Sequence, residues 1–210
     1  MKKIILTISI ILISILTIKA QKLSINGNLD FNIPQSDLSD VAGFGYGIRV
    51  GAEYLIFSTD ISENLKLNVS GGAEAAFSLF GKEEIAVGFP GFFEQTITLK
   101  SNAISANGYL KAGLRINKFE PYVSAGAGFL TGFVKMESDA AYFTDPFSGE
   151  QILVSPAMSE TDSGTEFLFQ PGVGVNYYLQ EKVKLTIGAS NAFANGFNFL
   201  NIRTGLSFVL

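Results

Sequence analysis

Leu200–Leu210, with the sequence L-N-I-R-T-G-L-S-F-V-L, is the stretch of the chain that decides its fold. Alternate positions are apolar except for Thr204, and they are Leu200, Ile202, Leu206, Phe208 and Leu210. The positions between them hold Asn201, Arg203, Gly205 and Ser207. Successive side chains of a β-strand point to opposite faces, so one face of this stretch is apolar and the other is polar. The pattern predicts the last strand of a membrane-spanning β-barrel, with its apolar face toward lipid.

The same alternation occurs in seven further segments upstream. The eight expected strands are 22–33, 43–56, 65–79, 98–117, 122–133, 167–177, 183–190 and 200–210. Pro34 is expected to end the first strand, because proline cannot continue a ladder. Long connections are expected after the first, third, fifth and seventh strands, with 81–94 and 137–164 the longest, and short turns, including 58–63, after the others. This predicts an all-β, eight-stranded antiparallel up-and-down transmembrane β-barrel with both termini in the periplasm.

The first 20 residues have the layout of a secretory signal peptide. Two lysines precede a fifteen-residue apolar run, and Ala20 follows as a small residue at the expected cleavage site. The run is short for a membrane-spanning helix, which needs about 20 residues. We therefore expect a signal peptide over 1–20 and a barrel domain over 21–210, with an uncleaved anchor as the alternative.

Composition excludes several classes of protein. The 210-residue chain has no cysteine, so it has no disulfide framework, and its 15 basic residues are not clustered in a way that indicates nucleic acid. It also has no histidine. Histidine is the common base near neutral pH, so its absence disfavours hydrolysis or acyl transfer. We expect no catalytic residues, no cofactor and no metal site.

A soluble secreted barrel of the lipocalin type is the structural alternative, because its strands also alternate. Such a barrel carries its apolar residues inside. Here the polar face carries many glycines and most of the strand charges, and aromatic residues gather toward both ends of the expected strands. These aromatic residues are Tyr54, Tyr177 and Phe208 at one end and Phe44, Phe77, Phe133 and Phe167 at the other. Two aromatic belts are typical of a membrane barrel.

Ten charged residues fall on the polar face, and we expect them in the barrel interior. They are Asp30, Arg49, Glu53, Lys66, Glu74, Lys111, Arg115, Glu166, Lys184 and Arg203. Because isolated buried ions are costly, they are expected to pair, with Glu53 opposite Lys66 and Arg203 near Asp30. An eight-stranded barrel is just wide enough for its own side chains, which favours a structural salt-bridge core. The alternative is a gated solute path lined by Arg49, Lys111 and Arg203.

The long connections contain 11 of the 19 acidic residues. These are Asp37, Asp40, Glu83, Glu84, Glu94, Glu137, Asp139, Asp145, Glu150, Glu160 and Asp162. They keep the loops solvated or, as a second hypothesis, bind divalent cations, which prefer carboxylate ligands. Segments 141–147 and 151–154 add apolar residues to the longest connection, which indicates a protein-contact patch or a β-hairpin above the membrane.

The alternating strands and the final segment 205–210 resemble the small eight-stranded outer-membrane proteins of the A and X type, and the short barrel-only proteins of Bacteroidota. The resemblance implies outer-membrane location, contact with outer-membrane lipid and lipopolysaccharide, and recognition of the last strand by the barrel-assembly machinery. It implies a fold and a location more than an activity. A structural or surface-interaction role is expected, and the second of these would involve a surface protein partner that the sequence does not identify. The alternatives are a narrow channel or small-solute transporter, and a component of an export or assembly complex.

Overall fold

The computed structural model describes residues 23–89, 93–145 and 147–210. The expected signal peptide and residues 90–92, which belong to the expected connection 81–94, lie outside these ranges. The described elements are β1 (Leu23–Gln35), the short 3-10 helix η2 (Ser36–Asp40), β2 (Gly43–Ser62), β3 (Leu65–Gly81), β4 (Glu83–Phe89), β5 (Phe93–Ile116), β6 (Phe119–Ser138), β7 (Ala141–Thr144), β8 (Gln151–Ser155), β9 (Met158–Gln180), β10 (Val183–Ala192) and β11 (Asn198–Val209). In this part of the chain, no helix has the length and apolar character needed to cross a membrane.

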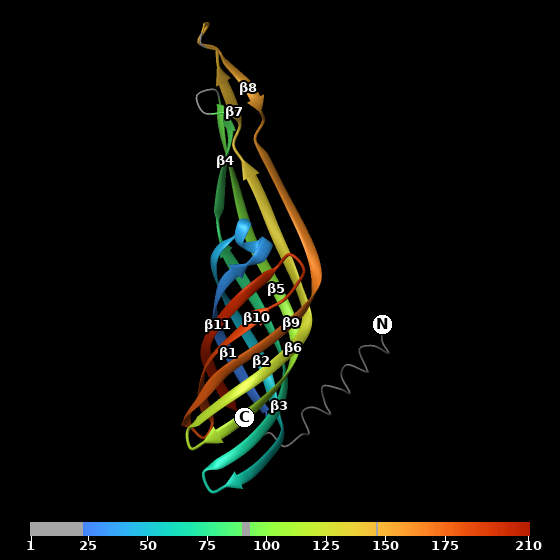
Figure 1. Cartoon of the computed structure of the whole chain (residues 1–210), viewed down its shortest axis with the longest axis vertical. Helices are drawn as coiled ribbons and strands as arrows, with labels where there is room; N and C mark the ends of the chain where they lie inside the picture. The colour runs from blue at the N-terminus through green and yellow to red at the C-terminus, as the bar shows by residue number, and fades with distance from the viewer. Residues whose placement is uncertain (1–22, 90–92, 146) are drawn as a thin grey trace, which may run out of the picture.

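Eight strands close into an antiparallel up-and-down ring, as the sequence predicts. Each of β1, β2, β3, β5, β6, β9, β10 and β11 pairs with its neighbours, and β3 pairs directly with β5. The ring closes between β1 and β11, from Ser24 opposite Val209 to Gln35 opposite Asn198. Figure 1 shows this ring as the lower body of the molecule, with η2 over one mouth. We call that mouth the loop end and the opposite mouth, where the chain makes its short turns, the turn end.

The alternation of side chains is confirmed and has the polarity of a membrane barrel. Apolar residues of the outer wall are exposed, with Leu110 at 62% and Val50 at 60%. Polar residues of the inner face are buried, and Asn176 and Asn201 have no exposed surface. This is the opposite of a soluble lipocalin-type barrel, which buries its apolar face.

Strands run further than the sequence analysis predicts at both ends of the barrel. Segment 81–94, expected as an irregular connection, forms β4 and the beginning of β5, which pair from Glu83 opposite Leu99 to Phe89 opposite Phe93. Segment 137–164, expected as the longest connection, contains the end of β6, the β7–β8 hairpin and the first part of β9. These predictions were wrong because they required an apolar outer face. Above the membrane the outer face is polar, although the strands continue.

Two smaller boundaries were also wrong. Pro34 does not end β1, since it lies opposite Phe199 in the pairing with β11. The pairing of β1 with β2 stops at Asn32 opposite Gly45, so Pro34 occupies an edge position on that side, where proline is tolerated. The expected turn at 58–63 is instead a continuation of the β2–β3 hairpin, which projects at the bottom of Figure 1, and the chain reverses only at residues 63–64.

Glycines on the inner face allow the strands to approach closely. A Cβ added at Gly128 would lie 2.1 Å from the carbonyl oxygen of Ala106, and one at Gly205 would lie 2.2 Å from the carbonyl oxygen of Gly27. Any other residue at these two positions requires movement of the neighbouring backbone. The glycine-rich inner face noted in the sequence thus lets eight strands close around a set of large polar side chains.

Candidate functional site

The barrel interior brings together seven of the ten predicted charges in two ion clusters. The upper cluster, nearer the loop end, contains Asp30, Arg49, Glu74 and Arg203. The lower cluster contains Glu53, Lys111 and Lys184. All of these side chains are buried except that of Arg203, which is 15% exposed. We therefore keep the interior charge network as a proposal, and it concerns these seven residues.

Arg49 is the centre of the upper cluster. Its Nε donates to Asp30 Oδ2 at 2.8 Å, and its Nη1 donates to Glu74 Oε1. Arg203 Nη1 reaches the second oxygen of Glu74 at 3.4 Å, and its Nη2 donates to Ser190 Oγ at 2.7 Å. Asp30 and Arg203 are direct cross-strand neighbours, as expected, but each forms its ion pair with another residue.

Glu53 holds the lower cluster together. Its Oε2 accepts from Lys111 Nζ and from the hydroxyl of Tyr109, and its Oε1 lies 2.9 Å from Lys184 Nζ. The expected pair of Glu53 with Lys66 was wrong. Lys66 lies on the projecting part of the β2–β3 hairpin, where it is 47% exposed and pairs with Asp60 at 3.0 Å.

The two remaining predicted residues lie outside both clusters. Arg115 donates from Nε to the carbonyl of Asn117 at 3.1 Å, and its guanidinium lies 3.8 Å from the ring centre of Tyr178. Glu166 is half-buried on β9, opposite Leu130, and has no ion-pair partner in the described ranges.

Glu120 is a buried charged residue that the sequence analysis missed. It lies at the beginning of β6 and is 3% exposed. Its carboxylate accepts from the side-chain amides of Asn68 and Asn176, each at 2.6 Å, and from the Tyr178 hydroxyl at 2.9 Å. The available signal is that Glu120 lies two residues before Tyr122 and so shares its face of the strand. The sequence analysis expected that strand to begin only at residue 122.

An apolar plug that the sequence analysis also missed closes the loop end above the upper ion cluster. Leu38 of η2 has no exposed surface and packs among residues of the inner barrel wall. The plug is formed by Leu38, Ala42, Phe80, Ala103, Leu130, Leu168, Ala192, Ala194 and Phe199, with Val41 and Phe197 packed against it. Phe80 and Phe199 meet edge to face with their ring centres 5.5 Å apart.

The cavities between these layers are small. One of about 40 Å³ lies between the two ion clusters and is lined by Glu53, Glu74 and Arg203 among others. Since a cavity needs roughly 10–15 Å³ of this kind to hold one water molecule, this space accommodates only a few waters. A larger cavity of about 240 Å³ opens at the turn end beside Lys184, Glu120 and Arg115.

A β-sheet extension projects from the loop end, as Figure 1 shows. It consists of β4, the upper parts of β5, β6 and β9, and the β7–β8 hairpin. Gln95 Nε2 donates to the Asp139 carbonyl at 2.7 Å, and Ala141 is buried, so the small hairpin is held against the sheet. The hairpin alternative for segments 141–147 and 151–154 is therefore confirmed.

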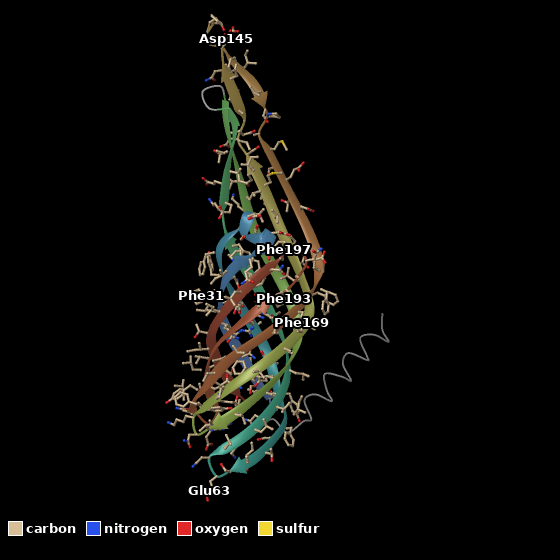
Figure 2. The ribbon with its side chains drawn as sticks, in the orientation of Figure 1. Phe31, Glu63, Asp145, Phe169, Phe193 and Phe197 are labelled. Atoms are coloured by element: carbon tan, nitrogen blue, oxygen red, sulfur yellow. The ribbon has the colours of Figure 1, made fainter. Side chains whose placement is uncertain are left out.

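The hairpin tip at Asp145, at the top of Figure 2, is ordered by its own side chain. Asp145 Oδ1 accepts from the Phe147 amide at 2.9 Å and Oδ2 from the Ser148 hydroxyl at 2.7 Å, and these bonds lower the pKa of Asp145. Gly149 has a φ of +72°, which favours glycine in this turn. Among the described residues, no group of three or more carboxylates is placed to hold a metal ion, and the divalent-cation hypothesis stays a prediction from sequence.

We expect Glu137, on the extension, to remain ionised well into the acid range. Hydrogen bonds from Lys100 and Lys135 lower the pKa of Glu137 from 4.5 to about 2. A depressed pKa means that this carboxylate stabilises the folded extension above about pH 4.5 and loses that contribution as the pH falls toward 2. A carbon NMR titration of the Glu137 carboxyl checks this. A midpoint near 4.5 in the intact protein contradicts it, and the K100Q/K135Q double variant provides the reference value.

Aromatic side chains on the outer wall lie where the sequence analysis expected membrane interfaces. Near the loop end, Phe44 and Phe167 are exposed, and each contacts a second ring, Phe31 and Phe129 respectively. Figure 2 labels Phe31, Phe169 and Phe193 at a similar height, just below the extension, and all three are exposed. The wall of the barrel is therefore apolar, with aromatic residues toward its loop end.

A closed eight-stranded ring with an apolar wall and a polar interior defines the small outer-membrane β-barrel proteins. The chain belongs to the outer membrane protein β-barrel domain family, whose model matches residues 8–208, and it is accordingly an outer-membrane protein. No curated protein matches it.

Several solved structures are similar to this chain at low sequence identity. Neisserial surface protein A is 14% identical with a TM-score of 0.50, and the match covers 90% of this chain and 97% of that one. The attachment invasion locus protein of Yersinia pestis is 12% identical, with a TM-score of 0.41 and coverage of 89% and 95%. The N-terminal barrel domain of Pseudomonas aeruginosa OprF is 14% identical, with a TM-score of 0.35 and coverage of 88% and 96%.

Proposed function

We propose that this protein is a closed, non-enzymatic outer-membrane barrel that anchors the loop-end extension at the cell surface, where the extension takes part in interactions. In this proposal the short turns and both termini lie in the periplasm. The observation that carries it is the filled interior, in which an apolar plug and two buried ion clusters follow one another along the barrel axis.

The filled interior supports a structural role over solute passage. A solute crossing the barrel has to displace Leu38 and the plug residues, then separate Arg49 from Asp30 and Glu74, and then separate Glu53 from its two lysines. Breaking a buried ion pair is strongly unfavourable, because it leaves an uncompensated charge in a low-dielectric environment.

Two features support a non-enzymatic role. The chain has no histidine, which is the usual base for activating serine or water near neutral pH. The buried carboxylates also have neighbours that stabilise their ionised form, as when Glu53 contacts two lysines and Tyr109. Such an arrangement is typical of a structural network and keeps these groups from exchanging protons with a substrate.

A narrow channel is the second candidate, and the turn-end cavity of about 240 Å³ is the observation that favours it. In that case Lys111, Arg49 and Arg203 line the path beyond this cavity, and their ion pairs form the gate. A component of an export or assembly complex is the third possibility, and it predicts a stable partner after mild extraction from membranes.

Epitope insertion tests the orientation and exposure of the extension. A short tag inserted after Ser148, in the exposed β7–β8 turn, is expected to be labelled on intact cells by an antibody that does not enter the periplasm. The same tag inserted after Glu63, in the β2–β3 turn, is the matched control and is expected to be labelled only after the outer membrane is permeabilised. Labelling of the Glu63 tag on intact cells contradicts the proposed orientation.

A further inference from the structure

The outer face of the sheet changes character just above the loop-end aromatic residues. Phe129 and Phe167 are exposed cross-strand neighbours whose rings meet edge to face. The next outward pair is Thr131 and Thr165, whose hydroxyls are 2.9 Å apart. On β6 the outward Phe133 follows Thr131, so the change from the hydrocarbon region to the headgroup region on this side of the barrel lies between Phe129 and Lys135.

Two lysines occupy the same outward face, in the next outward pair beyond Asn102 and Phe133. Lys100 of β5 and Lys135 of β6 are direct cross-strand neighbours, and they share the parity of the lipid-facing residues Ile104 and Phe129. Like charges directly opposite each other are unfavourable, and here both contact the single carboxylate of Glu137. The group therefore has two cations for one anion and keeps a net positive charge, with the lysine side chains 41% and 45% exposed.

The acidic residues of β9 lie on the other face of this sheet. Strand alternation places Ser159, Thr161, Ser163 and Thr165 on the outward face and Glu160, Asp162 and Glu166 on the opposite one. An anion approaching the outer face of β9 above the aromatic residues thus meets hydroxyls, and the carboxylates that share the outward face are Glu137 of β6 and Glu84 of β4. The acidic residues of β9 are directed away from this surface.

The depth of the lysines matches that of lipid phosphates. Lys135 follows the outward Phe133 by two residues, which is about 7 Å along a strand. Long lysine side chains commonly extend along an apolar surface and place their ammonium group in the headgroup layer. Geometry, charge and height therefore agree on one class of ligand.

We propose that the outer face of β5, β6 and β9 above Phe129 and Phe167 binds the phosphate group of an anionic lipid in the leaflet surrounding the loop end. Lys100 and Lys135 supply the charge, and Thr161, which lies directly opposite Lys135 on β9, supplies a hydroxyl. Glu137 holds the two lysines side by side and weakens the site by neutralising part of its charge. This inference depends on the barrel spanning a bilayer and holds whichever leaflet surrounds the loop end.

The test compares lipid retention by the refolded barrel in nanodiscs of phosphatidylcholine containing a minor fraction of phosphatidic acid, measured by native mass spectrometry at low salt. A basic residue near an anionic bilayer contributes about 1 kcal/mol, which is roughly a fivefold change in affinity. The K100Q/K135Q double variant is therefore expected to retain phosphatidic acid about 25-fold less well than the wild type. E137Q is expected to retain it more strongly than the wild type, because the two lysines then carry their full charge.

The matched control is K118Q/K182Q, which removes two lysines from the turn end and is expected to leave retention at the loop end unchanged. Heat-modifiable gel mobility verifies that every variant is folded. Inorganic phosphate at the lipid concentration is expected not to compete, since the bilayer holds the headgroup at the site. The proposal is overturned if K100Q/K135Q retains phosphatidic acid as well as the wild type does, or if the control loses retention equally. It is also overturned if E137Q does not change retention. Displacement of the lipid by free phosphate overturns the assignment to a lipid.

Discussion

Replacing Glu53 with glutamine is expected to destabilise the barrel by about 3–5 kcal/mol. The substitution leaves Lys111 and Lys184 buried without the carboxylate that both contact. Removing one partner of a buried ion pair is costly because the other charge stays desolvated and uncompensated. The measurement is urea unfolding of the refolded barrel in lipid vesicles, followed by the loss of its heat-modifiable mobility.

Two variants accompany this measurement. Lys66→Gln removes an exposed ion pair with Asp60 and is expected to change the stability by less than about 1 kcal/mol. The double variant E53Q/K184M removes one uncompensated ammonium and is expected to recover part of the loss. If E53Q unfolds at the same urea concentration as the wild type, the lower ion cluster does not hold the interior together.

Replacing Leu110 with arginine is expected to cost about 2–4 kcal/mol, because this side chain points toward lipid from the part of β5 that lies within the barrel wall. Leu110 lies between the small residues Gly71 and Ala125 of the neighbouring strands and is 62% exposed in the isolated chain. An arginine there has no neighbouring acid on the outer wall and must reach toward an interface to remain hydrated. The free energy of unfolding in vesicles measures the effect.

Leu153→Arg is the matched control for this experiment. Leu153 is a similarly exposed leucine, but it lies in β8 of the extension, above the membrane. Its replacement is expected to be nearly neutral. Equal losses in the two variants, or a neutral L110R, contradict the assignment of the outer wall to lipid.

The sequence was sufficient to predict the ring, its polarity and most of the interior charges. Period-two alternation identifies which residues share a face, and the arginine and glycine on the polar face of Leu200–Leu210 indicate that this face is the interior. The requirement for an apolar outer face failed in the extension, where the strands do not contact lipid. Strand extensions such as β4 and the first part of β9 were therefore expected to be loops.

Pairing inside the barrel could not be predicted because it crosses the lumen. Glu53 of β2 contacts Lys184 of β10, and β1 and β11 lie between these strands in the sheet. Such contacts depend on the stagger of the whole barrel, whereas the sequence analysis considered only adjacent strands. The plug was missed for a related reason, because Leu38 and Phe199 are apolar residues that point inward in a chain whose apolar residues otherwise point to lipid.

The central claim is that the barrel is closed, and conductance tests it most directly. Residues 21–210 are refolded, checked for heat-modifiable mobility, and inserted into a planar bilayer for single-channel recording. A plugged and ion-paired interior predicts a folded protein with no discrete openings. Reproducible openings in the wild type that change when Arg49, Lys111 or Arg203 is replaced contradict the closed barrel and support the channel.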